Sequence, residues 1–307
     1  MVVLGVVTGT FLLLHLAPGS PAAHLLGPAA SELDIAMTTR ALGLDQPIAE
    51  QYLRWIARAV RGDFGISIAT GRPVTRMLIE AWPATVILVG LSIILSYTVG
   101  ILVATWQATT NRRWVDNLLS FGTVTMAAVP GYWLAFVLVL GLSYELKWFP
   151  AFGAAGIDAE FLSPSGRFAD RLAHLALPLA TLTLIGIGTT ARYARGTLRT
   201  VRWAPFLVMA RAKGVTRWGV IFRHHLRNGL VPVVALLGLT LPALFSGTVF
   251  IEGVFGWPGV GQLLIQAVQA RDYPVVMAAT TISAALVVVG SAAAEQLLKA
   301  VDPRIDG

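Results

Sequence analysis

The sequence predicts an all-α, polytopic membrane protein with six transmembrane helices and with both termini in the cytoplasm. Three observations support this prediction: the composition, the length of the apolar runs and the distribution of Lys and Arg between the loops. Hydrophobic residues make up 56% of the 307 residues, and charged residues make up only 13%. Soluble globular domains carry roughly 25% charged residues. The composition therefore indicates an integral membrane protein and excludes an ordinary soluble domain.

Six apolar runs have lengths that suit spanning helices. They cover residues 1–17, 84–108, 117–143, 173–192, 229–251 and 275–298. A helix needs roughly 20 apolar residues to cross the hydrocarbon core, so the first run is at the short end of the range. We interpret it as a retained spanning helix, because it has neither the basic start nor a clear small-residue cleavage site of a secretory signal.

Residues 18–83 interrupt the apolar pattern and are predicted to form a small extracytoplasmic cap. Arginines and acidic residues are both frequent there. Between Gln51 and Gly62, apolar side chains at positions 53, 56 and 60 and arginines at positions 54, 58 and 61 fall on different faces of one helix. This spacing is typical of an amphipathic helix that lies on a surface, and Gly62 is expected to end it.

Residues 193–228, here called the basic loop, join the fourth and fifth apolar runs. Nine Lys and Arg residues and no acidic residue lie between positions 192 and 227. Cytoplasmic loops are enriched in Lys and Arg, so the basic loop, and with it both termini, is placed in the cytoplasm. We therefore expect three parts: a first helix at 1–17, the cap at 18–83 and a five-helix core at 84–307 that includes the basic loop.

Four arginines at the start of this segment recur at intervals of three and four residues, which places them on one face of a helix that leaves the membrane. They are Arg192, Arg195, Arg199 and Arg202. Two interpretations are open: snorkelling side chains that bind lipid headgroups, or a contact with a partner protein.

The segment Ala204–Gly214 shows a short helical pattern that a glycine ends. Its apolar side chains have no lipid to face, although a cytoplasmic loop gains nothing by showing them to water. They are Phe206, Leu207, Val208 and Met209. Burial of a helix in the groove of a partner explains both these side chains and the basic residues around them.

The basic loop contains ARAKG at 210–214 and RHHLRNGLVP at 223–232. Further motifs are APGSPAAHLLG at 17–27, LGLDQPIAEQYLRWIARAVRGDFGISIATGRPV at 42–74, HLALPLATL at 174–182, VFIEGVFGWPGVGQLL at 249–264, RDYPVV at 271–276 and DPR at 302–304. Taken together, they resemble binding-protein-dependent ABC transporter permeases of the dipeptide, oligopeptide and nickel branch. The chain departs from the family where Val208-Met209-Ala210 replaces Glu-Ala-Ala, and where Arg199 and Ala204-Pro205 stand in place of a Glu and an Asp-Tyr.

The resemblance implies the type I ABC importer permease fold and a transport subunit that is not an enzyme. It implies four kinds of partner: a second homologous permease, two ABC ATPase subunits, an extracytoplasmic substrate-binding protein and the lipid bilayer. ATP and magnesium would be bound by the ATPases, so no cofactor is expected in this chain. Nucleic acid is not expected as a partner. A self-sufficient channel or secondary transporter is the alternative from another class, and it would move substrate without ATP.

The resemblance also implies that di- or oligopeptides are the cargo, with nickel or a nickel chelate as the alternative. The spans contain no Cys, and only His15 and His174 lie at span ends. A dedicated path for a metal ion would need more thiolate or imidazole ligands. Peptides are better served by hydrogen-bonding side chains in the spans, for which Thr125, Trp133 and Thr240 are the candidates for a translocation path.

Two further sites follow from the resemblance. The expected ATPase-docking helix comprises Phe206, Leu207, Met209, Ala210, Arg211, Ala212, Lys213 and Gly214. The expected contact with the binding protein is the exposed run Gly62, Asp63, Phe64 and Gly65, for which the alternative is a cap that only seals the helices.

Two other patterns are interpreted as structural. The GxGxxA stretch at 186–191 lies inside an apolar run, so close helix packing explains it better than a dinucleotide site. His224-His225 is interpreted as a solvated loop pair, because adjacent side chains on a helix diverge and no metal is expected. The chain has no phosphate-binding P-loop and no ordered Ser-His-Asp arrangement, so ATP hydrolysis is placed in another chain.

Overall fold

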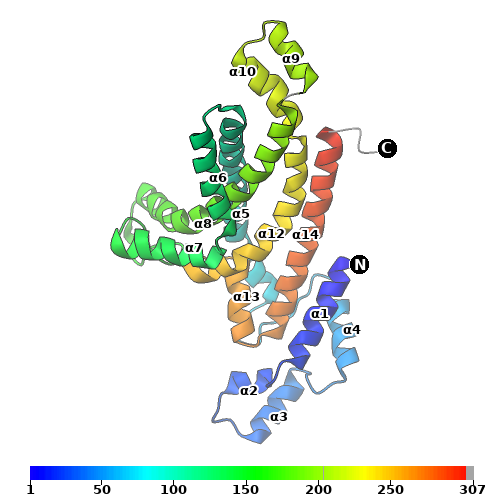
Figure 1. Cartoon of the computed structure of the whole chain (residues 1–307). Coiled ribbons are helices and arrows are strands. Elements are labelled where there is room, and N and C mark those ends of the chain that lie inside the picture. The colour runs from blue at the N-terminus through cyan, green and yellow to red at the C-terminus, as the bar shows by residue number, and fades with distance from the viewer. Residues whose placement is uncertain (203, 302–307) are drawn as a thin grey trace. The chain divides into compact units, whose positions relative to one another are not determined.

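The computed structural model describes residues 1–202 and 204–301, and over these residues it is built from helices (Figure 1). Within the described residues no strand forms beyond a single bridge between Ile66 and Pro73. The all-α prediction is confirmed. The tail from 302, which includes the DPR motif, lies outside the described residues. The chain forms two compact units, one of residues 1–85 and 258–288 and one of residues 86–257 and 289 onward.

The first unit contains the predicted first helix and the predicted cap. Its helices are α1 (Val2–Leu16), α2 (Pro21–Leu26), α3 (Glu32–Ala41), α4 (Ile48–Ala59), the start of α5 (Val74–Thr109), α13 (Val260–Gln269) and the start of α14 (Tyr273–Val301). The amphipathic helix predicted at 51–62 is α4. Gly62 follows it with a φ of 76°, a left-handed conformation that glycine adopts without strain.

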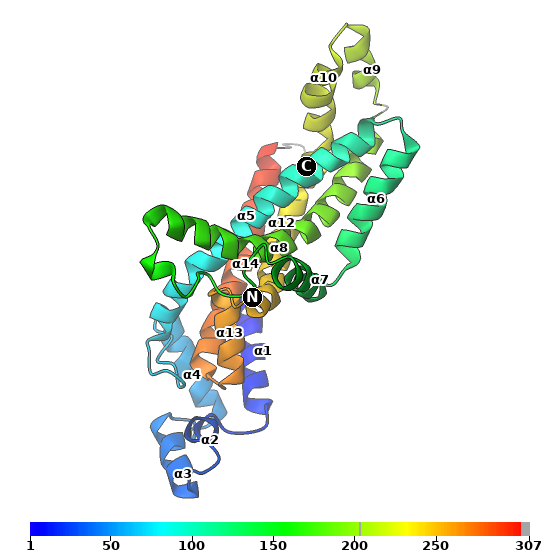
Figure 2. The ribbon, with the colours of Figure 1, turned by 90° about the vertical axis from the view of Figure 1, so that its left-hand side faces the viewer.

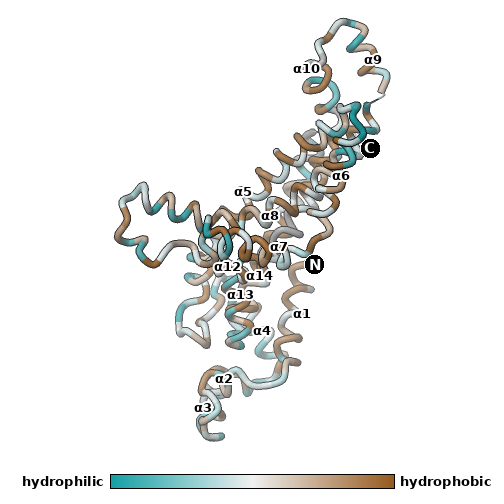
Figure 3. The backbone as a smooth tube through the Cα atoms, turned by 60° about the vertical axis from the view of Figure 1, so that its left-hand side comes forward, coloured by the Kyte–Doolittle hydropathy of each residue, from teal (hydrophilic) through white to brown (hydrophobic). Residues whose placement is uncertain are grey.

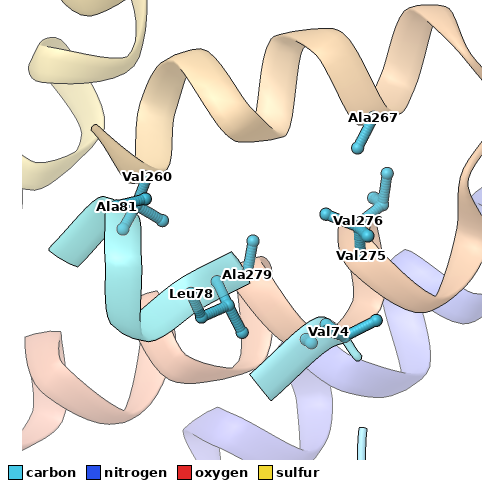
Figure 4. Close-up of a cluster of buried hydrophobic side chains, with 9 residues drawn as sticks. Val74, Leu78, Ala81, Val260, Ala267, Val275, Val276 and Ala279 are labelled. Atoms are coloured by element: carbon cyan, nitrogen blue, oxygen red, sulfur yellow. The ribbon is translucent and has the colours of Figure 1, made fainter. Parts of the chain in front are cut away.

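The core of the first unit joins three helices that are far apart in the sequence. Side chains of α5 (Val74, Leu78) meet side chains of α13 (Val260) and α14 (Val275, Val276) in one buried cluster (Figure 4). A second cluster joins α1, through Val7 and Phe11, to Met277 of α14. Burial of such side chains is the main favourable term that holds helices together outside lipid.

The apolar helix α1 has 15 residues, which corresponds to a length of about 22 Å at 1.5 Å per residue. Its polar groups contact α4: the Thr8 hydroxyl lies 2.6 Å from the Tyr52 hydroxyl, and His15 Nε2 lies 3.2 Å from Gln51 Oε1. These contacts explain why a polar face exists on a helix that is otherwise apolar.

The second unit contains most of the apolar helices. Besides the remainder of α5 and α14, it holds α6 (Arg113–Ala128), α7 (Gly131–Leu138), the π-helical segment η1 (Val139–Glu145), the short 3₁₀ turn η2 (Ala159–Phe161), α8 (Pro164–Val201), α9 (Pro205–Ala212), α10 (Arg217–Gly219), the π-helical segment η3 (Val220–Leu226), α11 (Arg227–Gly229) and α12 (Val231–Phe255).

The prediction of one continuous span at 117–143 is wrong. The helix ends at Ala128, and the chain turns by 106° before it continues as α7 and η1. Val129 is extended and Pro130 follows it. A residue before proline is disfavoured in the helical conformation, so the dipeptide Val129-Pro130 breaks a run that is apolar throughout.

Close packing of α8 against its neighbours requires small residues. Figure 2 shows α6 running alongside α8. A Cβ atom added at Gly188 would lie 2.6 Å from Ala127 N and 2.7 Å from Thr123 O of α6, and one added at Gly186 would collide with Ser96 of α5. The interpretation of the stretch at 186–191 as a helix-packing motif is confirmed.

Three helices within the described residues are long and apolar enough to cross a membrane: α5, α8 and α14. The number rises to five if each of two bent pairs of helices counts as one span. Figure 3 shows the hydrophobic colour along much of α5. Several membrane-length helices agree with a multi-pass protein, whereas the count of six spans and the side of the termini stay predictions.

Candidate functional site: the basic loop and the cap loop

Two arginines of the predicted stripe bind one carboxylate of the neighbouring helix. Arg195 donates to Asp116 Oδ1 through Nε at 3.1 Å and through Nη2 at 2.9 Å, and also reaches Oδ2 at 2.8 Å. Arg199 Nη2 donates to Asp116 Oδ2 at 2.7 Å. Such multiple charge-assisted bonds fix orientation as well as charge. The structure thus gives Arg195 and Arg199 an intramolecular partner that neither interpretation of the stripe included.

The turn between α5 and α6 is also bonded to the end of α8. Arg202 Nη2 donates to Asn111 Oδ1 at 3.0 Å, and within the α5–α6 hairpin Gln107 Nε2 donates to Ser120 Oγ at 3.0 Å. Together with Asp116, these bonds join the ends of three helices beside the basic loop. A displacement of the basic loop would therefore be passed to α8 and α6 together.

The predicted docking helix exists as α9. Pro205 occupies its first turn, where the missing N–H costs nothing, and Gly214 follows it with a φ of 77°. Phe206, Met209 and the run Arg211 to Gly214 are exposed. We therefore find most of the predicted docking residues on one accessible element.

One face of α9 is not available to a partner. Leu207 is only 1% exposed and Ala210 is buried, and both pack against Val220 and the half-buried Val201 and Val215. The four apolar side chains at 206–209 were expected to be buried in the groove of a partner, but Leu207 is already buried within its own chain. The inward side chains of an amphipathic helix hold it to its own chain, while Met209, at 58% exposure, points outward.

His225 is a structural histidine. It is 4% exposed, and its Nε2 lies 2.7 Å from the carbonyl oxygen of Leu198 in α8. Because a carbonyl only accepts hydrogen bonds, Nε2 carries the proton. The interpretation of His224-His225 as a solvated pair is therefore wrong for His225, whose ring ties η3 to α8.

The predicted binding-protein contact lies in a tight loop after α4. Asp63 accepts hydrogen bonds from Arg58 Nε and from the backbone N–H of Gly65, both at 2.9 Å. The bond from Arg58, followed by the bond from Gly65, holds the pKa of Asp63 below its ordinary value. Gly62 and Asp63 are exposed, whereas Phe64 and Gly65 are half-buried. The run is thus less open than expected, because Phe64 packs against the core of the first unit.

This loop borders a cavity of about 350 Å³. Asp63, Phe64 and Gly65 line one part of it, and His15 and Tyr273 line another. The cavity combines aromatic surfaces with charged groups, which is the composition of many ligand or peptide contact sites.

Asp272 is a functional candidate that sequence reasoning quoted only as part of the RDYPVV motif. It is buried and accepts hydrogen bonds from the Ser67 hydroxyl and from the backbone N–H of Ile68, at 3.2 Å, and Ala69, at 3.3 Å. It thereby fixes the end of the cap to the start of α14. The sequence signal for such a role is an acidic residue directly before Tyr-Pro at a helix start. A carboxylate that is buried there needs hydrogen-bond donors.

The three predicted path residues lie on three different helices, α6, α7 and α12. Thr125 lies on α6 and Trp133 lies beyond the bend on α7, and both are exposed. The Thr240 hydroxyl lies 2.8 Å from the Tyr97 hydroxyl. Within residues 1–202 and 204–301, no hydrogen bond joins any two of the three side chains. In the same residues no group of three or more His, Asp or Glu is arranged to hold a metal ion.

Two family descriptions match the chain. "Binding-protein-dependent transport system inner membrane component" matches residues 96–307, and the N-terminal description of the same transport system membrane component matches residues 1–89. The chain belongs to this family. The permease is thus an inner-membrane, multi-pass transport subunit of an ABC importer and not an enzyme.

Relatives match the permease over nearly its full length. The oligopeptide transport system permease protein AppB of Bacillus subtilis (strain 168) is 36% identical over 306 residues, which cover 99% of this chain and 95% of the relative. The glutathione transport system permease protein GsiC of Escherichia coli (strain K12) is 33% identical over 300 residues, with 96% and 92% covered.

A solved structure supports the fold. The chain is similar to one in a crystal structure of an amino acid ABC transporter with histidines, with a TM-score of 0.51 and 16% identity. The match covers 75% of this chain and 94% of the other. At this identity the similarity concerns the fold alone, and it agrees with the predicted importer permease architecture.

Proposed function

We propose that this permease moves di- or oligopeptides that an extracytoplasmic binding protein delivers, with energy from ATP hydrolysed by two partner ATPases. The observation that supports peptides as the cargo is the similarity, over nearly the full length, to permeases named for oligopeptides and for glutathione. Neither name indicates nickel, and the described residues offer no metal-binding group. ATP and magnesium then belong to the partner ATPases.

We propose further that the chain pairs with a second, homologous permease and spans the membrane six times with both termini inside. The basic loop then faces the cytoplasm and the cap faces outward. Exposed Met209 and Phe206 on α9 form the apolar part of an ATPase-docking surface, and Arg211 and Lys213 form its basic edge. Leu207 and Ala210 support this surface from within.

The docking proposal is tested by a pair of substitutions on α9 that differ only in burial. Met209→Asp places a charge on an exposed position, so the permease should insert and fold normally but lose co-purification of the ATPases and ATP-driven uptake. Leu207→Asp buries a charge and should destabilise the loop itself. Ile157→Asp, which changes a fully exposed residue of another loop, is the control. Normal uptake by the Met209 variant would refute the proposal.

The cargo is tested with the complete transporter and its binding protein in proteoliposomes. Uptake of a labelled dipeptide should require ATP and should fall when a mixture of di- to pentapeptides competes, whereas nickel should have no effect. Uptake without ATP would favour the channel or secondary transporter. Stimulation of ATPase activity by nickel and not by peptides would overturn the cargo assignment. Where dipeptide uptake is found, substitutions of the path candidates Thr125, Trp133 and Thr240 are compared by their effect on the dipeptide KM.

We also propose that Asp63 and Phe64 contact the binding protein. Their support is the exposed position of Asp63 on a loop that borders a mixed aromatic and charged cavity. The alternative is a cap that only seals the first unit, which the packing of Phe64 favours. A substitution of Asp63 separates the two alternatives, because among the described residues its side chain bonds only to Arg58 of α4 and to the backbone of Gly65.

A further inference from the structure

A cavity of about 310 Å³ lies behind the proposed docking helix, inside the second unit. Its floor is apolar and includes Leu207 and Val220. Its polar lining comes from four elements: Thr109 ends α5, Arg202 follows α8, Arg211 lies on α9, and His225 lies on η3. The volume is at the lower end of the range for small-molecule sites, roughly 300–1,000 Å³, so it suits a small ligand and not a folded partner.

The electrostatics of this cavity favour an anion. Two guanidinium groups line it, and among the described residues no carboxylate does. The nearby Asp116 is occupied by Arg195 and Arg199. The side chain of Arg211 makes no hydrogen bond or ion pair within the part of the chain that the structure describes. Its cationic fork is therefore available to a bound group.

The geometry points to a site for a phosphate-bearing anion between Arg202 and Arg211, and we propose this as a site additional to the docking surface. Guanidinium groups bind phosphate oxygens with paired hydrogen bonds, which makes phosphate the best-matched oxyanion. The phosphate belongs either to an anionic lipid headgroup or to a soluble phosphate ester. A lipid headgroup can reach the site, because α5 and α8 are membrane-length helices that end at this cavity. A soluble ester can reach it from the solvent, because Arg211 is exposed.

A ligand at this site would join α8 to α9. Arg202 belongs to the end of α8, which is tied to α6 through Asp116, and Arg211 belongs to α9. The bound phosphate would fix the angle of α9 and so favour one position of the docking surface. This consequence rests on the proposed ATPase docking, whereas binding of the anion does not.

The test uses the full-length permease alone in lipid nanodiscs, so that it does not depend on ATPase docking. In nanodiscs of phosphatidylcholine, binding of glycerol 3-phosphate is measured by calorimetry. In nanodiscs that also contain phosphatidylglycerol, native mass spectrometry counts the phosphatidylglycerol molecules retained by the protein. Saturable calorimetric binding identifies a soluble ester as a source, and retention of one phosphatidylglycerol without such binding identifies the lipid.

The variants decide whether the site is the one proposed. Arg211→Gln and Arg202→Gln should each weaken binding of the effective probe at least about tenfold, as expected for the loss of a charge-assisted hydrogen bond. Arg223→Gln is the charge-matched control, because Arg223 is exposed on η3 and does not line the cavity. Equal losses for Arg211→Gln and Arg223→Gln, or no binding of either probe by the wild type, would overturn the proposal.

Discussion

At the scale of single residues, Asp116 determines the geometry beside the basic loop. It is 15% exposed and is the shared acceptor of two arginines. Removal of one member of such a group leaves the other charges without their partner, which costs more than the pair contributes by itself. The arginine stripe was predicted from its spacing, but its partner was not, because the carboxylate lies about eighty positions away and no local pattern joins them.

We predict that Asp116→Asn lowers the thermal stability of the permease and uncouples ATP hydrolysis from transport. The amide keeps one acceptor but loses the charge that holds Arg195 and Arg199, a loss of about 1.5–3 kcal/mol for bonds to charged groups. Asp158→Asn serves as the control, because Asp158 is exposed in another loop. Unfolding temperature and the ratio of uptake to ATP hydrolysis are measured, and an unchanged ratio in a destabilised Asp116 variant would reduce its role to stability.

For Asp63, the lowered pKa sets the direction of a pH effect. Its ordinary value is 3.8, and the folded value lies below this. The stability that the ionised carboxylate contributes to the folded protein is complete above the unfolded pKa. It is lost only as the pH falls through the folded pKa. Asp63 therefore stays ionised between about pH 5 and 7.5, and its titration should cause no change across this range in the stimulation of ATPase activity by loaded binding protein.

Asp63→Asn should reduce that stimulation by the same factor at each pH of this window. The neutral amide no longer presents a charge to the binding protein, although it can still accept the bond from Gly65. Stimulation that is unchanged in the Asn variant would favour the cap that only seals the first unit.

At the scale of elements, the sequence predicted helices well where periodicity and end signals agree. The pattern of α4 and the glycine after α9 are examples. It predicted badly where two physical signals compete: the apolar run at 117–143 indicates one span, but Val129-Pro130 breaks it. The inward face of α9 was also missed, because the residues that bury Leu207 come from both sides of the helix in sequence, including Val201 and Val220.

The packing of α8 leads to a prediction with a matched control on the same helix. Gly188→Ala adds a methyl group within 2.6 Å of the α6 backbone, and overpacking of this kind costs about 1–3 kcal/mol. Gly196→Ala meets nothing within 4 Å and should be neutral or slightly stabilising, since alanine favours a helix over glycine. Thermal unfolding of the two purified variants is compared. Equal stability of both would contradict the close α6–α8 contact.

At the scale of the whole molecule, family and function follow from motifs spread over the entire chain. The RDYPVV motif contains Asp272, which holds residues 67–69 of the cap through hydrogen bonds, so this motif has a clear structural role. Partners were predicted from resemblance, and the exposed part of α9 supports one of them. The path could not be predicted from single residues, because which side chains face it depends on the geometry of the proposed pairing with a second permease.

The central claim is that the basic loop lies in the cytoplasm, where ATPases can reach it, while the cap lies outside. Because the chain has no cysteine, single substitutions Thr216→Cys in the basic loop and Ala69→Cys in the cap can be probed with a membrane-impermeant thiol reagent. Both positions are exposed. We predict that in intact cells only the cysteine at position 69 is labelled, and that both are labelled after the membrane is opened. Labelling of position 216 but not of position 69 in intact cells would contradict the account.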